Sequence, residues 1–151
     1  MTADNNVVSV KLMKENGQLI TLDVQGALGT WEEAKTVNFH PGDNDEKGAL
    51  VIQASDGYDN QDHCKMAGFI LHCEATDTTS PWHNFVSHKY WRSEDSKNLC
   101  SDSEAPFLGF NKAFINTMLN VGAKNVWVDG NKEVTLTGSP WSNGIFGFKY
   151  L

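Results

Sequence analysis

The sequence predicts a mostly β fold, an antiparallel β-sandwich with one or two flanking helices, formed by residues 1–151 as a single domain. Three observations lead to this prediction. Many apolar stretches have the length of a strand, turn signals separate several of them, and one segment alone has the apolar spacing of a helix. A chain of 151 residues can also bury a hydrophobic core without disulfide or metal cross-links.

The first two expected strands, residues 7–13 and 18–24, are joined by Glu15, Asn16 and Gly17. Asn-Gly is a strong hairpin signal because both residues tolerate a positive φ. Along the first strand, apolar residues alternate with polar ones and so predict one buried face: Val8, Val10 and Leu12.

Apolar runs and turn residues also predict the later elements. Further strands are expected at residues 35–40, 49–54, 66–73 and 145–150, and a second hairpin at 126–128 and 133–136 around Asp129-Gly130. The helix is expected within residues 103–122, where Gly122 would form the C-terminal cap. Its apolar positions have helical spacing: Phe107, Phe110, Phe114, Met118 and Val121.

Charge and motifs argue against several classes of function. The formal net charge is −7, and the 12 Lys and Arg residues are scattered, so we expect no binding to nucleic acid and no strong attraction to anionic lipid. The sequence contains no nucleophile elbow, no P-loop, no dinucleotide glycine motif and no H-E-x-x-H zinc motif. We therefore expect a protein that is not an enzyme.

The N-terminus has no apolar signal region, and no run approaches the length of a transmembrane helix. The odd number of cysteines, Cys64, Cys73 and Cys100, leaves at least one thiol unpaired, which suits a reducing compartment. The expected location is cytoplasmic, with release by a non-classical route as the alternative.

We expect no cofactor and no metal. His72 and Cys73 are zinc-type ligands, but in a strand they would point to opposite faces, Cys73 into the core and His72 to solvent. Three aspartates in residues 56–62 do not match the pattern of a calcium loop, and calcium binding there stays open.

The stretch TTSPWHNFVSHKYW, residues 78–91, combines aromatic residues with polar ones and two histidines. Sugars present apolar C–H patches and a rim of hydroxyl groups, so a sugar site needs a flat aromatic surface beside a few fixed polar groups. We therefore expect this stretch to stand at the rim of the sandwich, with Trp82 and its polar neighbours partly open to water. The alternative is that its rings close the end of the sandwich.

Short motifs of the chain resemble those of the fungal fruit-body lectins. Gly29-Thr30-Trp31 follows the first hairpin, Lys47-Gly48 leads into an apolar strand, and residues 81–87 loosely match the R-W-C-D-I-V-T motif of that family. The resemblance implies an actinoporin-like β-sandwich and a lectin or agglutinin with a role in defence. The family's H-N-Y-K run, which contacts sugar, is replaced here by residues 77–80, so one of its two sites is altered.

The resemblance carries Asn84, Phe85 and Ser87 over to the second sugar site, while Gly48 borders the altered one. Together with the aromatic argument it gives the expected carbohydrate-binding set: Gly48, Trp82, Asn84, Phe85, Ser87, Trp91 and Arg92. Glycans or glycoconjugates are the expected partners, and any membrane contact would run through glycans or lipid headgroups. Because single sugar sites bind weakly, a homo-oligomer is also expected.

Three other functions stay open at this point. A membrane-surface-binding or cytolytic protein of the same fold is one, although only residues 1–6 precede the first strand, and a pore former needs an amphipathic N-terminal helix. A glycan-acting enzyme would need two carboxylates near Trp82. A protein-interaction module would use the aromatic cluster as its binding hot spot.

Overall fold

The structure, a computed structural model, describes residues 1–3, 6–27, 30–40, 47–55, 68–88, 91–93, 112–127 and 133–140. Within these ranges the fold is mostly β, every strand pair is antiparallel, and the sole helix is α1 (Ala113–Asn120). This confirms the expected β-rich class. The predicted last strand at 145–150 and the loop at 56–62 lie outside the described residues.

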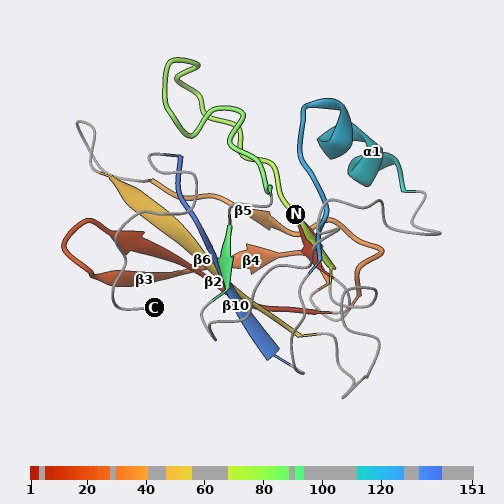
Figure 1. Ribbon diagram of the computed structural model, residues 1–151, viewed down its shortest axis with the longest axis horizontal. Helices are drawn as coiled ribbons and strands as arrows, with labels where there is room; N and C mark the ends of the chain where they lie inside the picture. Colours follow the sequence, from red (N-terminus) through yellow and green to blue (C-terminus); the bar gives the residue numbers. More distant parts are fainter. Residues whose placement is uncertain are drawn as a thin grey trace.

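The strands form three sheets (Figure 1). The five-stranded sheet has the order β3 (Leu19–Leu22), β2 (Asn6–Lys14), β6 (Gly48–Ser55), β10 (Glu133–Gly138), β8 (Arg92–Ser93). The three-stranded sheet has the order β1 (Thr2–Ala3), β7 (Gly68–Ile70), β9 (Val126–Trp127). A short pair joins β4 (Val24–Gln25) to β5 (Thr36–Val37).

The first hairpin forms as predicted, with Leu12 opposite Ile20 and Met13 opposite Leu19. Its turn consists of the three residues expected between the strands, Glu15, Asn16 and Gly17. Gly17 alone has a positive φ, of 88°, and its N–H donates to the Lys14 carbonyl, which gives a three-residue loop. The Asn16 side chain instead accepts a hydrogen bond from the Gln18 N–H at 2.9 Å.

The predicted buried face of β2 is wrong at one residue. Val10 and Leu12 are buried, but Val8 is 45% exposed. The register shifts between Val7 and Ser9, which pair with the consecutive residues Ala54 and Gln53, so Val8 is the extra residue of a β-bulge. Because of the bulge, Val7 is buried and Val8 is not.

The hairpin predicted around Asp129-Gly130 is not formed. β9 pairs with β7 in the three-stranded sheet, whereas β10 pairs with β6 and β8 in the five-stranded sheet. The main core contains residues of both sheets: Ala3, Phe69 and Val126 from the smaller one, and Val10, Leu12, Leu50, Ile52 and Leu136 from the larger one. β9 and β10 therefore lie in different sheets although they are close in sequence, and both sheets contribute residues to one core.

Helix α1 occupies only the end of the segment predicted as helical, and residues 103–111 lie outside the described chain. The cap is confirmed, because Gly122 has a φ of 101°. The Gly122 N–H donates to the Leu119 carbonyl and the Ala123 N–H to the Met118 carbonyl, the bonds of a Schellman motif. Of the apolar positions in this segment, Ile115 and Met118 are buried, whereas Val121 is 42% exposed.

Residues 71–87 leave the sheets as a long hairpin at the top of Figure 1. His72 and Val86 form an isolated bridge, and the Ser87 N–H donates to the Leu71 carbonyl at 3.0 Å. Ile70 and Val86 also pack with Ile115 of α1, so hairpin and helix share a small second core. None of the described helical residues forms a helix long and apolar enough to cross a membrane.

Candidate functional site

Trp82, Phe85 and Trp91 of the 78–91 stretch form part of the core, so the expectation that Trp82 stands partly open to water is wrong. Trp82 is 3% exposed, Phe85 7% and Trp91 2%. Trp82 packs edge-on against Phe39 and Phe85, with ring centroids 5.2 and 5.5 Å apart. Each ring removes a large apolar area from water, and this outweighs the polarity of the sequence around it.

Trp91 is held in the core by contacts with Phe85, Val86 and Gly138. Its ring stacks on Phe85 at 5.5 Å and 15°, and its Nε1–H donates to the Val86 carbonyl at 3.1 Å. The indole lies directly over Gly138 of β10, where a Cβ would come within 2.2 Å of the ring. Trp91 is therefore a structural residue in this fold.

Two more residues of the expected set, Ser87 and Gly48, offer no surface group to a ligand, and the side chain of a third is not described. Ser87 is fully buried, donates to the Lys124 carbonyl at 2.7 Å and accepts from the Leu71 N–H at 2.9 Å. Gly48 is buried, and its carbonyl accepts from the Ser139 hydroxyl at 2.8 Å. The backbone of Arg92 pairs with Thr137, and its side chain lies outside the described structure.

Asn84 alone of the set presents a described side chain to solvent. Its φ is 58°, the left-handed region that asparagine tolerates better than most residues. The Asn84 N–H donates to the Cys73 carbonyl at 3.0 Å, and the Cys73 N–H donates to the Phe85 carbonyl at 2.8 Å. Two residues thus face one across the hairpin, a bulge that sends Phe85 into the core and Asn84 outward.

Two histidines fix the polar groups around Asn84. His72 Nε2 lies 3.1 Å from Asn84 Oδ1, and the Ala75 N–H donates to His83 Nδ1 at 3.2 Å. His83 Nδ1 is therefore an acceptor, which leaves Nε2–H as the donor of that ring. The Asn84 amide nitrogen is likewise left available because its oxygen faces His72.

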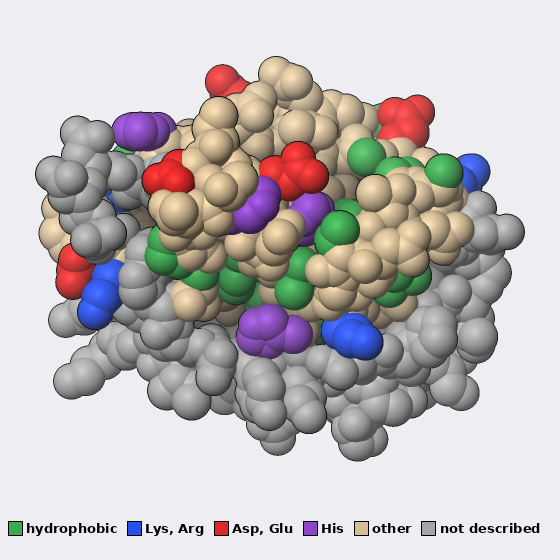
Figure 2. All heavy atoms as spheres, turned by 90° about the horizontal axis from the view of Figure 1, so that it is seen from above, with side chains coloured by type: hydrophobic (Ala, Val, Ile, Leu, Met, Phe, Trp, Pro, Cys, Tyr) green, Lys and Arg blue, Asp and Glu red, His purple; other side chains and the backbone are tan. Residues whose placement is uncertain are grey.

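We call His72, Glu74, His83 and Asn84 the polar ledge. Figure 2 shows histidine side chains gathered in the middle of this face, with an acidic side chain beside them. Further along the hairpin, the backbone is held by local bonds. Asp77 accepts from the Thr79 N–H at 2.9 Å and from its hydroxyl at 2.6 Å, and these bonds lower the pKa of Asp77. The ledge thus contains three side chains held by hydrogen bonds, His72, His83 and Asn84, together with the exposed Glu74.

Cys73 lies beneath the ledge with a free thiol, half-buried against the main core. This agrees with its predicted inward direction, while His72 faces the ledge. Burial raises the pKa of the Cys73 thiol to about 12, so the thiol is protonated and a poor nucleophile near neutral pH. Among the described residues no group of three or more His, Cys, Asp or Glu side chains could hold a metal ion.

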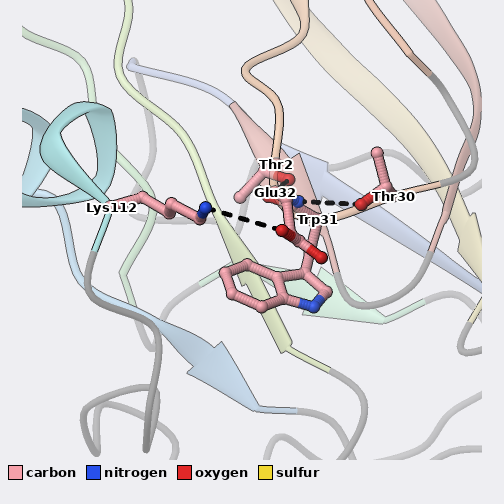
Figure 3. A network of polar contacts seen from close by, with 5 residues as sticks. All are labelled: Thr2, Thr30, Trp31, Glu32 and Lys112. Atoms are coloured by element: carbon pink, nitrogen blue, oxygen red, sulfur yellow. Dashed lines mark hydrogen bonds and ion pairs between the residues drawn. The ribbon is translucent and has the colours of Figure 1, made fainter.

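A second feature lies on the loop that precedes β5, and we call it the Trp31 corner: Thr30, Trp31, Glu32 and Lys112 (Figure 3). Glu32 Oε2 lies 3.5 Å from Lys112 Nζ, at the start of α1, and Lys112 Nζ lies 6.0 Å from the centroid of the Trp31 ring. The indole is half-buried and packs against the core beneath α1. This places an aromatic ring beside a carboxylate and an ammonium group.

The loop of the Trp31 corner is anchored from below by Lys35, which is buried. Lys35 Nζ donates to the carbonyls of Thr30 and Glu33 and to the Thr2 hydroxyl, which in turn donates to the Trp31 carbonyl at 2.8 Å. Burial lowers the pKa of Lys35, and the nearby Glu33 charge raises it in part. The sequence signal for this corner is the adjacency of Trp31 and Glu32 in a polar turn, although the sequence prediction includes Trp31 only through the family motif.

Comparison with protein-family models, with curated proteins and with solved structures finds no significant match to this chain. The resemblance to fungal fruit-body lectins therefore rests on short motifs alone.

Proposed function

We propose that the protein is a carbohydrate-binding protein without catalytic activity, built on an actinoporin-like β-sandwich. The binding surface in this proposal is the polar ledge, not the ring surface expected from the sequence. Asn84 is the residue common to the sequence prediction and to the exposed site. The buried rings have a supporting role, because they hold the hairpin that carries Asn84.

The observation that supports this proposal most is the pair of hydrogen bonds that fix the Asn84 and His83 side chains. The bond between His72 and Asn84 engages the amide oxygen of Asn84 and leaves its amide nitrogen as a donor, and the bond from Ala75 engages Nδ1 of His83 and leaves Nε2–H as a donor. Glu74, also exposed, supplies an acceptor on the same hairpin. Sugar hydroxyls both donate and accept, so fixed donors beside an acceptor complement them at little cost in side-chain entropy.

A ledge with few contacts binds one sugar weakly. A dissociation constant on the order of millimolar corresponds to about −4 kcal/mol. Such a protein is effective when several copies bind one glycan-bearing surface, because avidity then multiplies the affinity without new contacts. Assembly into a homo-oligomer is therefore part of this proposal.

The test compares wild type with Asn84→Gly on a glycan array. Glycine adopts a φ of 58° without steric strain, so this variant removes the amide and leaves the bulge intact. We expect array binding to fall by about tenfold or more while the free energy of unfolding stays the same or rises. Asn84→Ala is a poorer probe, because alanine itself destabilises this conformation.

The matched control is Thr78→Ala, an exposed position on the same hairpin outside the ledge. It should bind the array like wild type. Wild-type protein that binds no glycan at any density, or an Asn84→Gly variant that binds every glycan like wild type, would contradict the proposed site.

A further inference from the structure

We propose that the Trp31 corner is a second binding site, specific for a neutral pyranose with an apolar face and two adjacent hydroxyl groups. This inference rests on the proposed glycan-binding function but not on the ledge. The corner belongs to a different loop and a different part of the core. It also supplies the aromatic surface that the ledge lacks.

The Trp31 ring packs against a small core and lies near a charged pair. Its support is the small core of Ile70, Ile115, Met118 and Ala123, against which the half-buried indole packs. Figure 3 shows the Glu32 carboxylate and the tip of Lys112 meeting beside the ring. A pyranose laid on the remaining indole surface would place its C–H groups on the ring and its hydroxyls at these two side chains.

The Glu32–Lys112 pair is open enough to accept a ligand. The side chains are 57% and 41% exposed, and at 3.5 Å their contact is long for a charge-assisted hydrogen bond. Exposed pairs of this kind contribute little to stability, so exchanging their mutual contact for a ligand costs little. One hydroxyl can donate to Glu32 while its neighbour accepts from Lys112, which is the pattern of a vicinal diol.

The charges select a neutral ligand. An acidic sugar would gain from Lys112 but would be repelled by Glu32, only 3.5 Å away from that ammonium group. A cationic ligand over the ring would meet Lys112, whose Nζ already lies 6.0 Å from the ring centroid. A neutral polyol uses the carboxylate, the ammonium and the ring together.

The loop is already held in the shape that the site requires. The Glu32 N–H donates to the Thr30 hydroxyl at 3.1 Å, and the Trp31 carbonyl accepts from Thr2 at 2.8 Å. Lys35 joins the carbonyls of Thr30 and Glu33 from the buried side. A ligand therefore does not have to order this loop, which removes a usual cost of binding.

The experiment is a titration of the full isotope-labelled chain, followed by the proton–nitrogen resonances of its five indole groups. Trp31→Phe assigns the Trp31 resonance by its disappearance. The probes are neutral methyl glycosides of several hexoses, with glucuronate as the acidic probe. We expect the Trp31 resonance to shift in a saturable way with at least one neutral glycoside and not with glucuronate.

Two variants test whether Glu32 and Lys112 contact the ligand, and a third variant serves as control. Glu32→Gln and Lys112→Met should each raise the dissociation constant measured at Trp31 by about fivefold to tenfold, while the other indole resonances stay in place. Val8→Thr, at an exposed position of β2, should leave it unchanged. A Trp31 resonance that no neutral glycoside shifts, a preference for glucuronate, or dissociation constants that neither variant changes would each overturn the inference.

The result of the titration at Trp31 does not depend on whether the polar ledge binds glycans. If Asn84→Gly abolishes array binding and Trp31 never shifts, the proposed function stands and the second site is wrong. If Trp31 shifts saturably while Asn84→Gly changes nothing on the array, the second site stands and the ledge is wrong.

Discussion

The burial of Trp91 over Gly138 gives a quantitative test of the core. In Gly138→Ala the new Cβ would lie 2.2, 2.4 and 2.5 Å from three atoms of the indole, whereas ordinary contacts lie at 3.4–4 Å. The ring must therefore move by roughly an ångström. It is held by its stack on Phe85 and by its bond to the Val86 carbonyl, so movement weakens both contacts.

Overpacking of this kind costs about 1–3 kcal/mol, and loss of the indole hydrogen bond adds about 1 kcal/mol. We expect Gly138→Ala to lower the free energy of unfolding by about 2–4 kcal/mol. Urea unfolding followed by far-ultraviolet circular dichroism measures it, and this signal depends less on the altered indole than tryptophan fluorescence does. Gly138 has no positive φ, so backbone strain does not contribute to the effect.

A double-mutant cycle with Trp91→Leu isolates the contact. The smaller side chain makes room for the added methyl group, so the double variant should be more stable than the sum of the single changes predicts, by at least about 1 kcal/mol. Additive effects, or a Gly138→Ala variant within about 0.5 kcal/mol of wild type, would refute the placement of the indole over Gly138. Trp91 would then be available for the surface role that the sequence indicated.

Three further predictions concern single residues. Asn84→Ala should be about 1 kcal/mol less stable than Asn84→Gly in urea unfolding, because only glycine relaxes at a φ of 58°. Gly122→Ala should cost about 1 kcal/mol by the same measurement, since its φ of 101° forms the helix cap with no atom nearby to clash. For Cys73, the folded pKa of about 12 lies above the ordinary 9, so its thiol stabilises the fold fully below pH 9, and this contribution declines as the pH rises from 9 towards 12. Between pH 8 and 10 wild type should lose about 1 kcal/mol more than Cys73→Ala, and equal losses would contradict the burial of the thiol.

The site could be predicted only in part from the sequence. The sequence selects Asn84 because polar residues beside aromatic ones indicate a sugar site, and the structure shows that this side chain is exposed. The same argument chose Trp82 and Phe85, which are buried, because composition does not say which way a ring faces. The bulge at Asn84 and Phe85 decides that direction, and it depends on a pairing with Cys73 across the hairpin.

The sequence by itself determined the β-rich class, the first hairpin with its glycine turn, the central strand β6 and the Gly122 cap. These features depend on alternation over a few residues or on the backbone freedom of one glycine, so local chemistry is sufficient to specify them. Tertiary structure alone decided that β9 and β10 enter different sheets, that Val8 forms a bulge, and that Trp31 lies beside Lys112. Each of these depends on contacts between segments far apart in the chain, where the burial of apolar area in one shared core outweighs local preference.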